Sequence, residues 1–280
     1  MKNPDERLGL GRLSLGLAFT ILLYFGGNAG KAESLLSSSS AEGSPVVVVE
    51  LFTSQGCSSC PPADRLLTHI GETDDFAGEK TVTIPLSYHV DYWNRIGWTD
   101  PFSSQKWSVR QRRYATALNL RSVYTPQMVV NGVREFVGSN SAKAVEVITS
   151  EGQRTAPGWV EIEVNPEGLG SRRLVVDVRA NLGGTAEGAS AYAVVVLCES
   201  GLVTSVQSGE NANRTLANDH VVRALERAFL LTGGDRSEGS ERVVFDLERD
   251  WNTDRLGVVA FLQSRETMEI FGATRVDLSR

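Results

Sequence analysis

The sequence has few cysteines and histidines, no excess of basic residues and no long hydrophobic run. Three cysteines and three histidines among 280 residues are too few for the repeated ligands of closed zinc centres. The 28 lysines and arginines are outnumbered by 34 aspartates and glutamates, which argues against nucleic acid and anionic membranes as main partners. The sequence also lacks an internal repeat, a phosphate-binding loop, a hydrolase serine elbow and a paired-carboxylate motif.

The N-terminal segment has the pattern of an export signal. Basic residues precede a mostly apolar stretch from Leu13 to Phe25, which is shorter than the roughly 20 residues that span a bilayer. Small residues up to Ala32 suit a signal peptidase, so residues 1–32 are predicted to be a signal peptide. An uncleaved membrane anchor is the alternative. Cleavage would leave 24 basic and 32 acidic residues, a net charge of −8. We therefore expect a periplasmic or secreted protein without stable membrane association.

The rest of the chain divides into three parts by composition. Residues 33–45 are rich in serine, which predicts a flexible tether. Residues 46–154 alternate between strand and helix patterns, which is typical of an α/β domain. Residues 158–280 contain short strands between glycine-rich turns, which predicts a β-rich, sandwich-like C-terminal domain. Whether this last region packs separately or extends the first sheet stays open.

The α/β region has clear local signals for each element. An Asn131-Gly132 pair between apolar runs predicts a hairpin, and Ser104 and Asn140 are candidate helix caps. In the last region, residues 219–231 have the pattern of a helix. The predicted elements before the boundary are a strand at 46–53, a helix at 61–71, a strand at 81–88, a helix from Ser103 or Ser104, strands at 127–130 and 133–137, and a helix from Ser139 or Asn140 to 150.

Two of the cysteines lie between the first strand and the first helix. Cys57 and Cys60 are three positions apart, and Pro61 follows directly, where the first turn of a helix tolerates proline. A thiolate near a helix N-terminus is stabilised by free N–H groups and the helix dipole, so its pKa falls. We expect Cys57 to be the nucleophile, nearer to solvent, and Cys60 to be the resolving thiol. An inert structural disulfide is the alternative.

The order of elements around this motif resembles the thioredoxin fold. The stretches Glu50–Asp64, Tyr88–Asn94 and Tyr124–Pro126 are similar to a secreted bacterial thioredoxin-like family catalogued as a domain of unknown function. The likeness continues through 209–211, 214–216, 221–223 and 258–263, so it covers most of the chain after the predicted signal. The family has no settled substrate.

The resemblance implies roles for further residues. Pro126, after Thr125, occupies the place of the cis-proline that lies against the active-site disulfide in thioredoxin-like proteins. Glu50 falls, allowing one inserted residue, where thioredoxins place a buried acid that helps to deprotonate the resolving thiol. A surface carboxylate is the alternative for Glu50.

Other candidates lie after the second predicted strand. His89 and Asp91 could act behind the cysteines, because histidine titrates near neutral pH and can also bind metal. The aromatic residues Tyr92, Trp93 and Trp98 could line a peptide groove or pack on their own domain. Arg110 belongs to a basic cluster that we interpret as a solvated helix face. Cys198, which ends an apolar run, is expected to be a buried reduced thiol.

These residues predict an exported thiol–disulfide oxidoreductase that acts on protein thiols or disulfides of other exported proteins. One alternative is a copper-handling protein in which Cys57 and Cys60, aided by His89 or Met128, hold Cu(I), since thiolates suit that ion. Another is a noncatalytic binding module. We predict no cofactor and no resident metal, and the sequence leaves the oligomeric state open.

Overall fold

The computed structural model describes residues 36–39, 45–73, 76, 81–183, 188–234 and 237–278. The predicted signal peptide, residues 1–32, lies outside the described residues. The described part belongs to one compact unit, Glu33–Arg280. Its strands are β1 (Leu36–Ser39), β2 (Val46–Thr53), β3 (Val82–His89), β4 (Gln127–Val130), β5 (Arg134–Val137), β6 (Gly158–Asn165), β7 (Arg173–Leu182), β8 (Ser190–Glu199), β9 (Leu202–Ser205), β10 (Thr215–Asn218), β11 (Val221–Thr232), β12 (Glu238–Asp246), β13 (Leu256–Ser264) and β14 (Ile270–Asp277).

The described residues also form the α-helices α1 (Pro61–Glu72), α2 (Gln105–Ala117) and α3 (Ser141–Glu151). Short 3-10 turns are η1 (Asn94–Ile96), η2 (Pro166–Ser171) and η4 (Thr253–Arg255). The fold is mixed α/β and rich in strands, as predicted. None of the helices in the described ranges has the length and apolar composition that crossing a bilayer requires.

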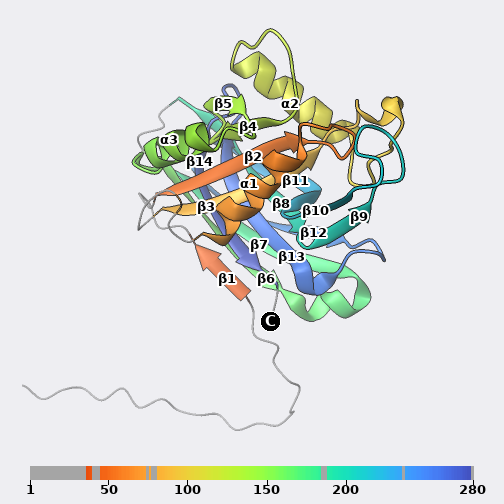
Figure 1. Ribbon diagram of the computed structural model, residues 1–280. Coiled ribbons are helices and arrows are strands. Elements are labelled where there is room, and N and C mark those ends of the chain that lie inside the picture. Colours follow the sequence, from red (N-terminus) through yellow and green to blue (C-terminus); the bar gives the residue numbers. More distant parts are fainter. Residues whose placement is uncertain are drawn as a thin grey trace, which may run out of the picture. The chain divides into compact units, whose positions relative to one another are not determined.

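An eight-stranded sheet with the order β14-β13-β8-β11-β3-β2-β4-β5 joins both predicted regions (Figure 1). Strands β2 and β3 are parallel and lie on either side of α1 in sequence, whereas β4 and β5 form the predicted antiparallel hairpin. Strand β11 pairs with both β3 and β8, so it links the segment 46–154 to the segment 158–280. The C-terminal strands therefore extend the first sheet.

The two faces of this sheet are covered differently. Helix α2 packs on one face over an apolar cluster that includes Phe52, Tyr88 and Phe261. On the other face, α1 and α3 cover β2 and β4, with Leu51 and Leu67 among the buried residues. On that face of the C-terminal strands lies a second, four-stranded sheet with the order β1-β6-β7-β12, across an apolar core. Because side chains alternate along a strand, neighbouring residues of β2 point into different cores.

Two local expectations are wrong. The segment 219–231 is the long strand β11 and not a helix, because its backbone pairs with β8 along almost its whole length. Within the predicted tether of residues 33–45, Leu36–Ser39 forms strand β1, which pairs with β6. Polar side chains do not prevent this pairing, since it uses backbone groups that an edge strand leaves free. The other local predictions agree with the structure, including the caps Ser104 and Asn140.

Candidate functional site

Cys57 and Cys60 form a disulfide at the start of α1. The amide N–H of Cys57 donates to the carbonyl oxygen of Ser54 (3.1 Å), and that of Cys60 donates to the carbonyl oxygen of Cys57 (3.2 Å), which makes the loop tight. Cys60 is the N-cap residue, and its carbonyl oxygen accepts the N–H groups of Ala63 and Asp64. The helix therefore begins directly after the second cysteine, at the prolines.

Both cysteines are buried in this disulfide-bonded state. Each is 0% exposed, whereas Ser58 and Ser59 between them are exposed. The prediction that Cys57 lies nearer to solvent is therefore wrong for this state. A thiol from another molecule cannot reach either sulfur without movement of the residues that surround the loop.

The turn before β4 lies against the disulfide. The peptide bond between Thr125 and Pro126 is cis, which confirms the prediction for that bond. The carbonyl oxygen of Thr125 is 3.9 Å from Sγ of Cys57. The indole N–H of Trp93 donates to the hydroxyl of Thr125 (2.8 Å), and Trp93 also packs against Gly56. Trp93 therefore joins the turn at Pro126 to the cysteine loop.

A buried polar network lies at the carboxyl ends of β2 and β3. Nδ1 of His89 is 2.7 Å from Oδ2 of Asp100, which also accepts the backbone N–H of Gln55 in the cysteine loop (2.8 Å). The hydroxyl of Thr53 donates to Oδ1 of Asp64 (2.7 Å), and Thr53 is paired with His89 across the two strands. The network thus ties the cysteine loop to the first turn of α1. Nε2 of His89 is buried and has no hydrogen-bond partner among the described residues.

The acids and the histidine of this network have shifted pKa values. Burial raises the pKa of Asp64 to about 6, although the charge of His89 and the Thr53 hydrogen bond oppose that shift. Burial alone would lower the pKa of His89, but the charge and hydrogen bond of Asp100 raise it above its ordinary value. Burial alone would raise the pKa of Asp100, but the charge of His89 and the hydrogen bonds that Asp100 accepts lower it below its ordinary value. Asp64 is therefore a buried acid that titrates close to neutral pH.

Glu50 does not join this network. It is 0% exposed, so it is not the surface carboxylate of the alternative reading, and it points to the α2 face of β2. Its Oε1 accepts Nε of Arg110 (2.8 Å), and its Oε2 accepts the hydroxyl of Tyr114. Leu51, the next residue, packs on the α1 face. Among the described residues, neither cysteine is a partner of Glu50, so the structure does not bring the two together.

Two further expectations need correction. Arg110 is only 7% exposed because it binds Glu50, so it is not part of a solvated helix face. The carboxylate of Asp91 accepts the hydroxyl of Ser108 on α2, and this interaction directs Asp91 away from the network of His89. Cys198 is buried and free, as predicted, and burial raises the pKa of its thiol to about 11.

A loop from the C-terminal region covers the cysteine loop, and sequence reasoning gave it no role. We call residues 206–214 the covering loop; they connect β9 to β10, which contacts α1 (Figure 1). Asn211 is 0% exposed and donates both amide hydrogens, one to the carbonyl oxygen of Gln55 and one to that of Cys57 (2.9 Å each). Oε2 of Glu210 accepts the backbone N–H of Ser58 (3.0 Å). The covering loop therefore binds main-chain groups of Gln55, Cys57 and Ser58, before and after the Cys57 side chain.

Side chains of the hairpin strands and two glycines complete this contact. The amide nitrogen of Gln55 donates to Thr204 on β9 and to Asn218 on β10 (3.0 Å each). Gly97 and Gly209 both have positive φ, and a Cβ on Gly97 would lie 3.3 Å from Cα of Gly209. Only glycine suits a left-handed backbone at such a close approach. The available signal was the resemblance through residues 209–211, which identified the segment without a role.

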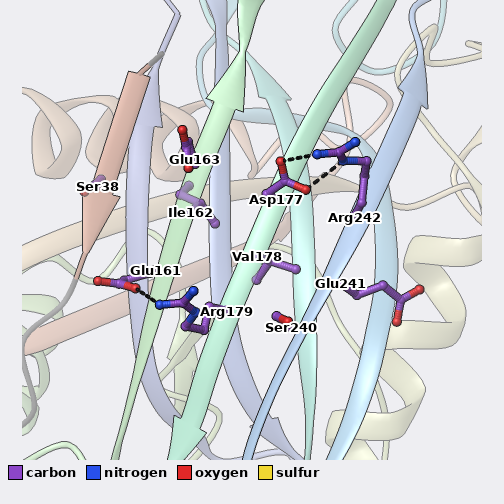
Figure 2. A pocket seen from close by; sticks show the side chains of 10 residues that line it. All are labelled: Ser38, Glu161, Ile162, Glu163, Asp177, Val178, Arg179, Ser240, Glu241 and Arg242. Atoms are coloured by element: carbon purple, nitrogen blue, oxygen red, sulfur yellow. Dashed lines mark hydrogen bonds and ion pairs between the residues drawn. The ribbon is translucent and has the colours of Figure 1, made fainter.

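The rest of the molecule offers no competing site for a metal ion among the described residues. The described residues contain no group of three or more His, Cys, Asp or Glu side chains that could hold a metal ion. Met128 is a fully buried core residue below α1 and α3. A cavity of about 660 Å³ lies on the outer face of the four-stranded sheet, remote in the fold from the disulfide (Figure 2). Both of its arginines are paired, Arg242 with Asp177 and Arg179 with Glu161, and the described residues that line it include no cysteine or histidine, so we place the candidate site at the cysteines.

Comparison with known proteins gives a family and a fold. The pattern of a family described as "Protein of unknown function (DUF1223)" matches residues 48–263. A crystal structure of protein AGR_C_4864 from Agrobacterium tumefaciens is 27% identical, with a TM-score of 0.58, over 84% of this chain and 95% of that one. HBP35 of Porphyromonas gingivalis is similar at 14% identity and a TM-score of 0.56, over 84% of this chain and 75% of that one. No curated protein matches the sequence.

Proposed function

We propose that this chain, which belongs to the DUF1223 family, is an exported thioredoxin-like thiol–disulfide oxidoreductase acting on protein thiols or disulfides. The observation that carries the proposal is the disulfide between Cys57 and Cys60 at the N-terminus of α1, with Thr125 beside the first sulfur. Helix N–H groups that lack partners stabilise a thiolate at this position.

A purely structural role explains this disulfide poorly. Cross-linking residues stabilises a fold mainly by restricting the unfolded chain, and this effect grows with the length of the closed loop. The sequence separation here is 3, so the closed loop is very short. The surrounding loops are already held by hydrogen bonds to Asp100, Asn211 and Glu210. Redox exchange gives the pair a purpose that stability does not.

The proposed reaction transfers two electrons. A substrate thiolate attacks Sγ of Cys57, a mixed disulfide forms, the Cys57–Cys60 bond breaks, and Cys60 leaves as a thiolate that takes up a proton. A second substrate thiolate then attacks the substrate sulfur and releases Cys57 as a thiolate. The products are a substrate disulfide and the reduced Cys57–Cys60 pair, and the reverse sequence reduces a substrate disulfide.

Asp64 is the buried acid best placed to exchange a proton with Cys60. It lies four residues after Cys60, so the two side chains share one side of the helix start. Its amide N–H donates to the carbonyl oxygen of Cys60 (3.1 Å), and its pKa of about 6 allows both protonation states near neutral pH. Asp64 thus takes the role that the resemblance implied for Glu50.

Trapping of mixed disulfides tests the proposal. In Cys60→Ser the attacking thiol remains but the resolving thiol is gone, so adducts with exported proteins should accumulate. The variant would be produced with its export signal and separated on non-reducing gels, with Cys198→Ser as the matched control that keeps the pair intact. We expect adducts that vanish on reduction in Cys60→Ser and none in the control. A Cys60→Ser variant that is exported, folded and free of adducts would refute the proposal.

The exported location has its own test. If residues 1–32 are a cleaved signal, the mature protein should begin at Glu33 and be found outside the cytoplasm. N-terminal sequencing of the protein recovered from each cell fraction decides this point. A mature protein that starts at Met1 in the cytoplasm would contradict export, and in that compartment thiols are kept reduced.

A further inference from the structure

The covering loop is bonded to the cysteine loop through Asn211, and both cysteines beneath are buried. Asn211 has two donors and uses each on a main-chain carbonyl of the cysteine loop, those of Gln55 and Cys57. Its own Oδ1 accepts Nη1 of Arg214 (3.0 Å), so its side chain is fully engaged. These bonds close the loop over a disulfide whose two cysteines are 0% exposed. Both of these bonds would have to break for the covering loop to move off the cysteine loop.

Glu210 adds a charge at the same place. It is exposed, and Oε2 is 3.0 Å from the backbone nitrogen of Ser58, the residue after Cys57. Hydrogen bonding from the Ser58 hydroxyl, and then from its backbone N–H, lowers the pKa of Glu210, so the group is an anion at neutral pH. Four covalent bonds separate the Ser58 nitrogen from Sγ of Cys57, which keeps the carboxylate within about 8 Å of the sulfur, roughly one Debye length at physiological ionic strength. An incoming thiolate meets this charge.

We propose that the covering loop determines which thiols react with the disulfide: Asn211 holds it closed, and Glu210 disfavours thiols that carry further negative charge. This inference rests on the proposed function and names its substrate class, which is neutral or basic thiols. Two features then set the rate at which a small thiol reduces the disulfide. The opening equilibrium affects every thiol alike, whereas the charge of Glu210 separates them.

The experiment measures the reduction rate of the disulfide in the full mature chain with three probe thiols. These are cysteamine, which is cationic, 2-mercaptoethanol, which is neutral, and 2-mercaptoethanesulfonate, which is anionic. Reduced protein is counted by alkylation and mass spectrometry. The ratio of variant to wild-type rate is compared for each thiol, so that differences between the thiols themselves cancel. Gln207→Ala is the matched control, because Gln207 is exposed in the same loop and, among the described residues, its side chain donates to the carbonyl oxygen of Ser205 at the end of β9 and not to the cysteine loop.

The two variants should change the rates in different ways. For Glu210→Gln we expect the rate to rise most with 2-mercaptoethanesulfonate, whose thiolate carries two negative charges, and about threefold with 2-mercaptoethanol, whose thiolate carries one. The rate with cysteamine, whose thiolate is balanced by its ammonium group, should stay close to wild type, and high salt should remove these differences. For Asn211→Ala we expect all three rates to rise about tenfold, because opening no longer breaks two buried hydrogen bonds. Gln207→Ala should match wild type. Gly209→Ala, whose Cβ would lie 3.1 Å from Cβ of Trp98, is a second opening variant if Asn211→Ala does not fold.

Each outcome decides the inference. Equal changes for all three thiols in Glu210→Gln would overturn the role of its charge. Unchanged rates in the opening variants would show that the covering loop does not limit access. These rates use small thiols and do not depend on adducts with exported proteins. A Cys60→Ser variant without adducts beside charge-ordered rates would therefore refute the proposed function and leave the access control standing.

Discussion

Glu50 and Asp64 are both buried carboxyl groups, and they lie on opposite sides of the sheet, Glu50 on the α2 side of β2 and Asp64 on helix α1. Glu50 is held by the guanidinium of Arg110, with Nη2 of the arginine 2.7 Å from Oε1, and by the hydroxyl of Tyr114. Burial and the charge of Glu50 raise the pKa of Tyr114, although Arg110 opposes this, so the tyrosine stays protonated and donates. Gln263 completes the cluster by accepting from Arg110.

Asp64 has a weaker set of partners. The side chain of Asp64 accepts a hydrogen bond from the neutral hydroxyl of Thr53, and the charge of His89 acts on it without a direct hydrogen bond between them among the described residues. Burial therefore dominates and raises its pKa, which favours the protonated form. The two buried carboxyls thus differ in their partners, since Glu50 has a cation and, in the part of the chain that the structure describes, Asp64 has none bonded to it. This difference supports the proton exchange that we propose for Asp64.

The largest effect should come from breaking the Glu50 ion pair. Arg110→Met removes the cation and leaves a buried carboxylate without its charged partner, so we expect a loss of about 3–5 kcal/mol in the free energy of unfolding. Denaturant unfolding of the oxidised protein measures it. The double variant Glu50→Met with Arg110→Met is the control and should recover most of the loss, since a buried pair can be replaced by apolar residues. A single variant as stable as wild type would show that the pair is not the main partner.

Asp64→Asn should act in the opposite direction. The native pKa of Asp64, about 6, lies above its value of 3.8 in the unfolded chain, so the native state binds more protons between these pH values. Stability from this group is therefore greatest below pH 4 and falls as the pH rises to about 6. The shift corresponds to about 3 kcal/mol at most. Asn can still accept from Thr53, so the variant should be more stable than wild type at pH 7.5 and similar at pH 3.5.

Unfolding by urea at both pH values measures this effect. Asp91→Asn is the matched control. Asp91 follows the end of β3, is only half-buried, and accepts the hydroxyl of Ser108 on α2. The control should keep the wild-type dependence on pH. A difference between wild type and Asp64→Asn that stays the same at both pH values would contradict the assignment of Asp64 as the titrating acid.

The contrast between the two carboxyls also explains what the sequence could predict. Local signals were sufficient for the cysteine loop, the helix caps and the hairpin at Asn131, because each depends on a few adjacent residues. The place of Glu50 could not be read in this way. Side chains alternate along a strand, so an error of one residue moves a side chain to the other face of the sheet. Asp64 ends the stretch Glu50–Asp64 that resembles the family, but its burial depends on contacts with Thr53 and the end of β3.

Long-range contacts account for the remaining failures. Strand β11 has a helix-like pattern of apolar residues, and pairing with β8 and β3 overrides it. Asn211 lies more than 150 positions from Gln55 and Cys57 in the sequence, and nothing local connects it to them. The resemblance identified the segment around Asn211 as part of the family pattern. Its role became visible only through the fold.

A smaller effect is expected for the partner of His89. In Asp100→Asn, the amide oxygen can take the place of Oδ2 and keep Gln55 and His89. The new NH₂ group then faces the backbone N–H of Phe102, which donates to Oδ1 in the wild type (2.9 Å), so one donor loses its acceptor at a cost of about 2 kcal/mol. The raised pKa of His89 contributes stability that is present below 6.5 and lost as the pH rises through its native value. The lowered pKa of Asp100 contributes stability that is present above 3.8 and lost as the pH falls through its native value.

The difference between Asp100→Asn and wild type should therefore be largest at about pH 5 to 6, where both groups are charged in the native state. Thermal unfolding across that range measures it. The conservative control is Asp100→Glu, which keeps the charge and should retain the pH profile at lower overall stability. A loss that does not vary with pH would mean that the backbone bonds from Gln55 and Phe102, and not the charge of His89, are the important contacts.

The smallest effect should come from an ion pair that has good geometry but no burial. Arg242 and Asp177 form two parallel bonds of 2.8 and 2.9 Å on the outer face of the four-stranded sheet (Figure 2), with both side chains exposed. Water and salt screen such a pair, so Asp177→Asn should leave the free energy of unfolding unchanged within the precision of the measurement. Arg242→Lys, which keeps the charge but loses the planar pair of donors, is the matched variant and should also be silent. A loss comparable to that of Arg110→Met would show that the geometry of the pair, and not its burial, makes the Glu50 cluster strong.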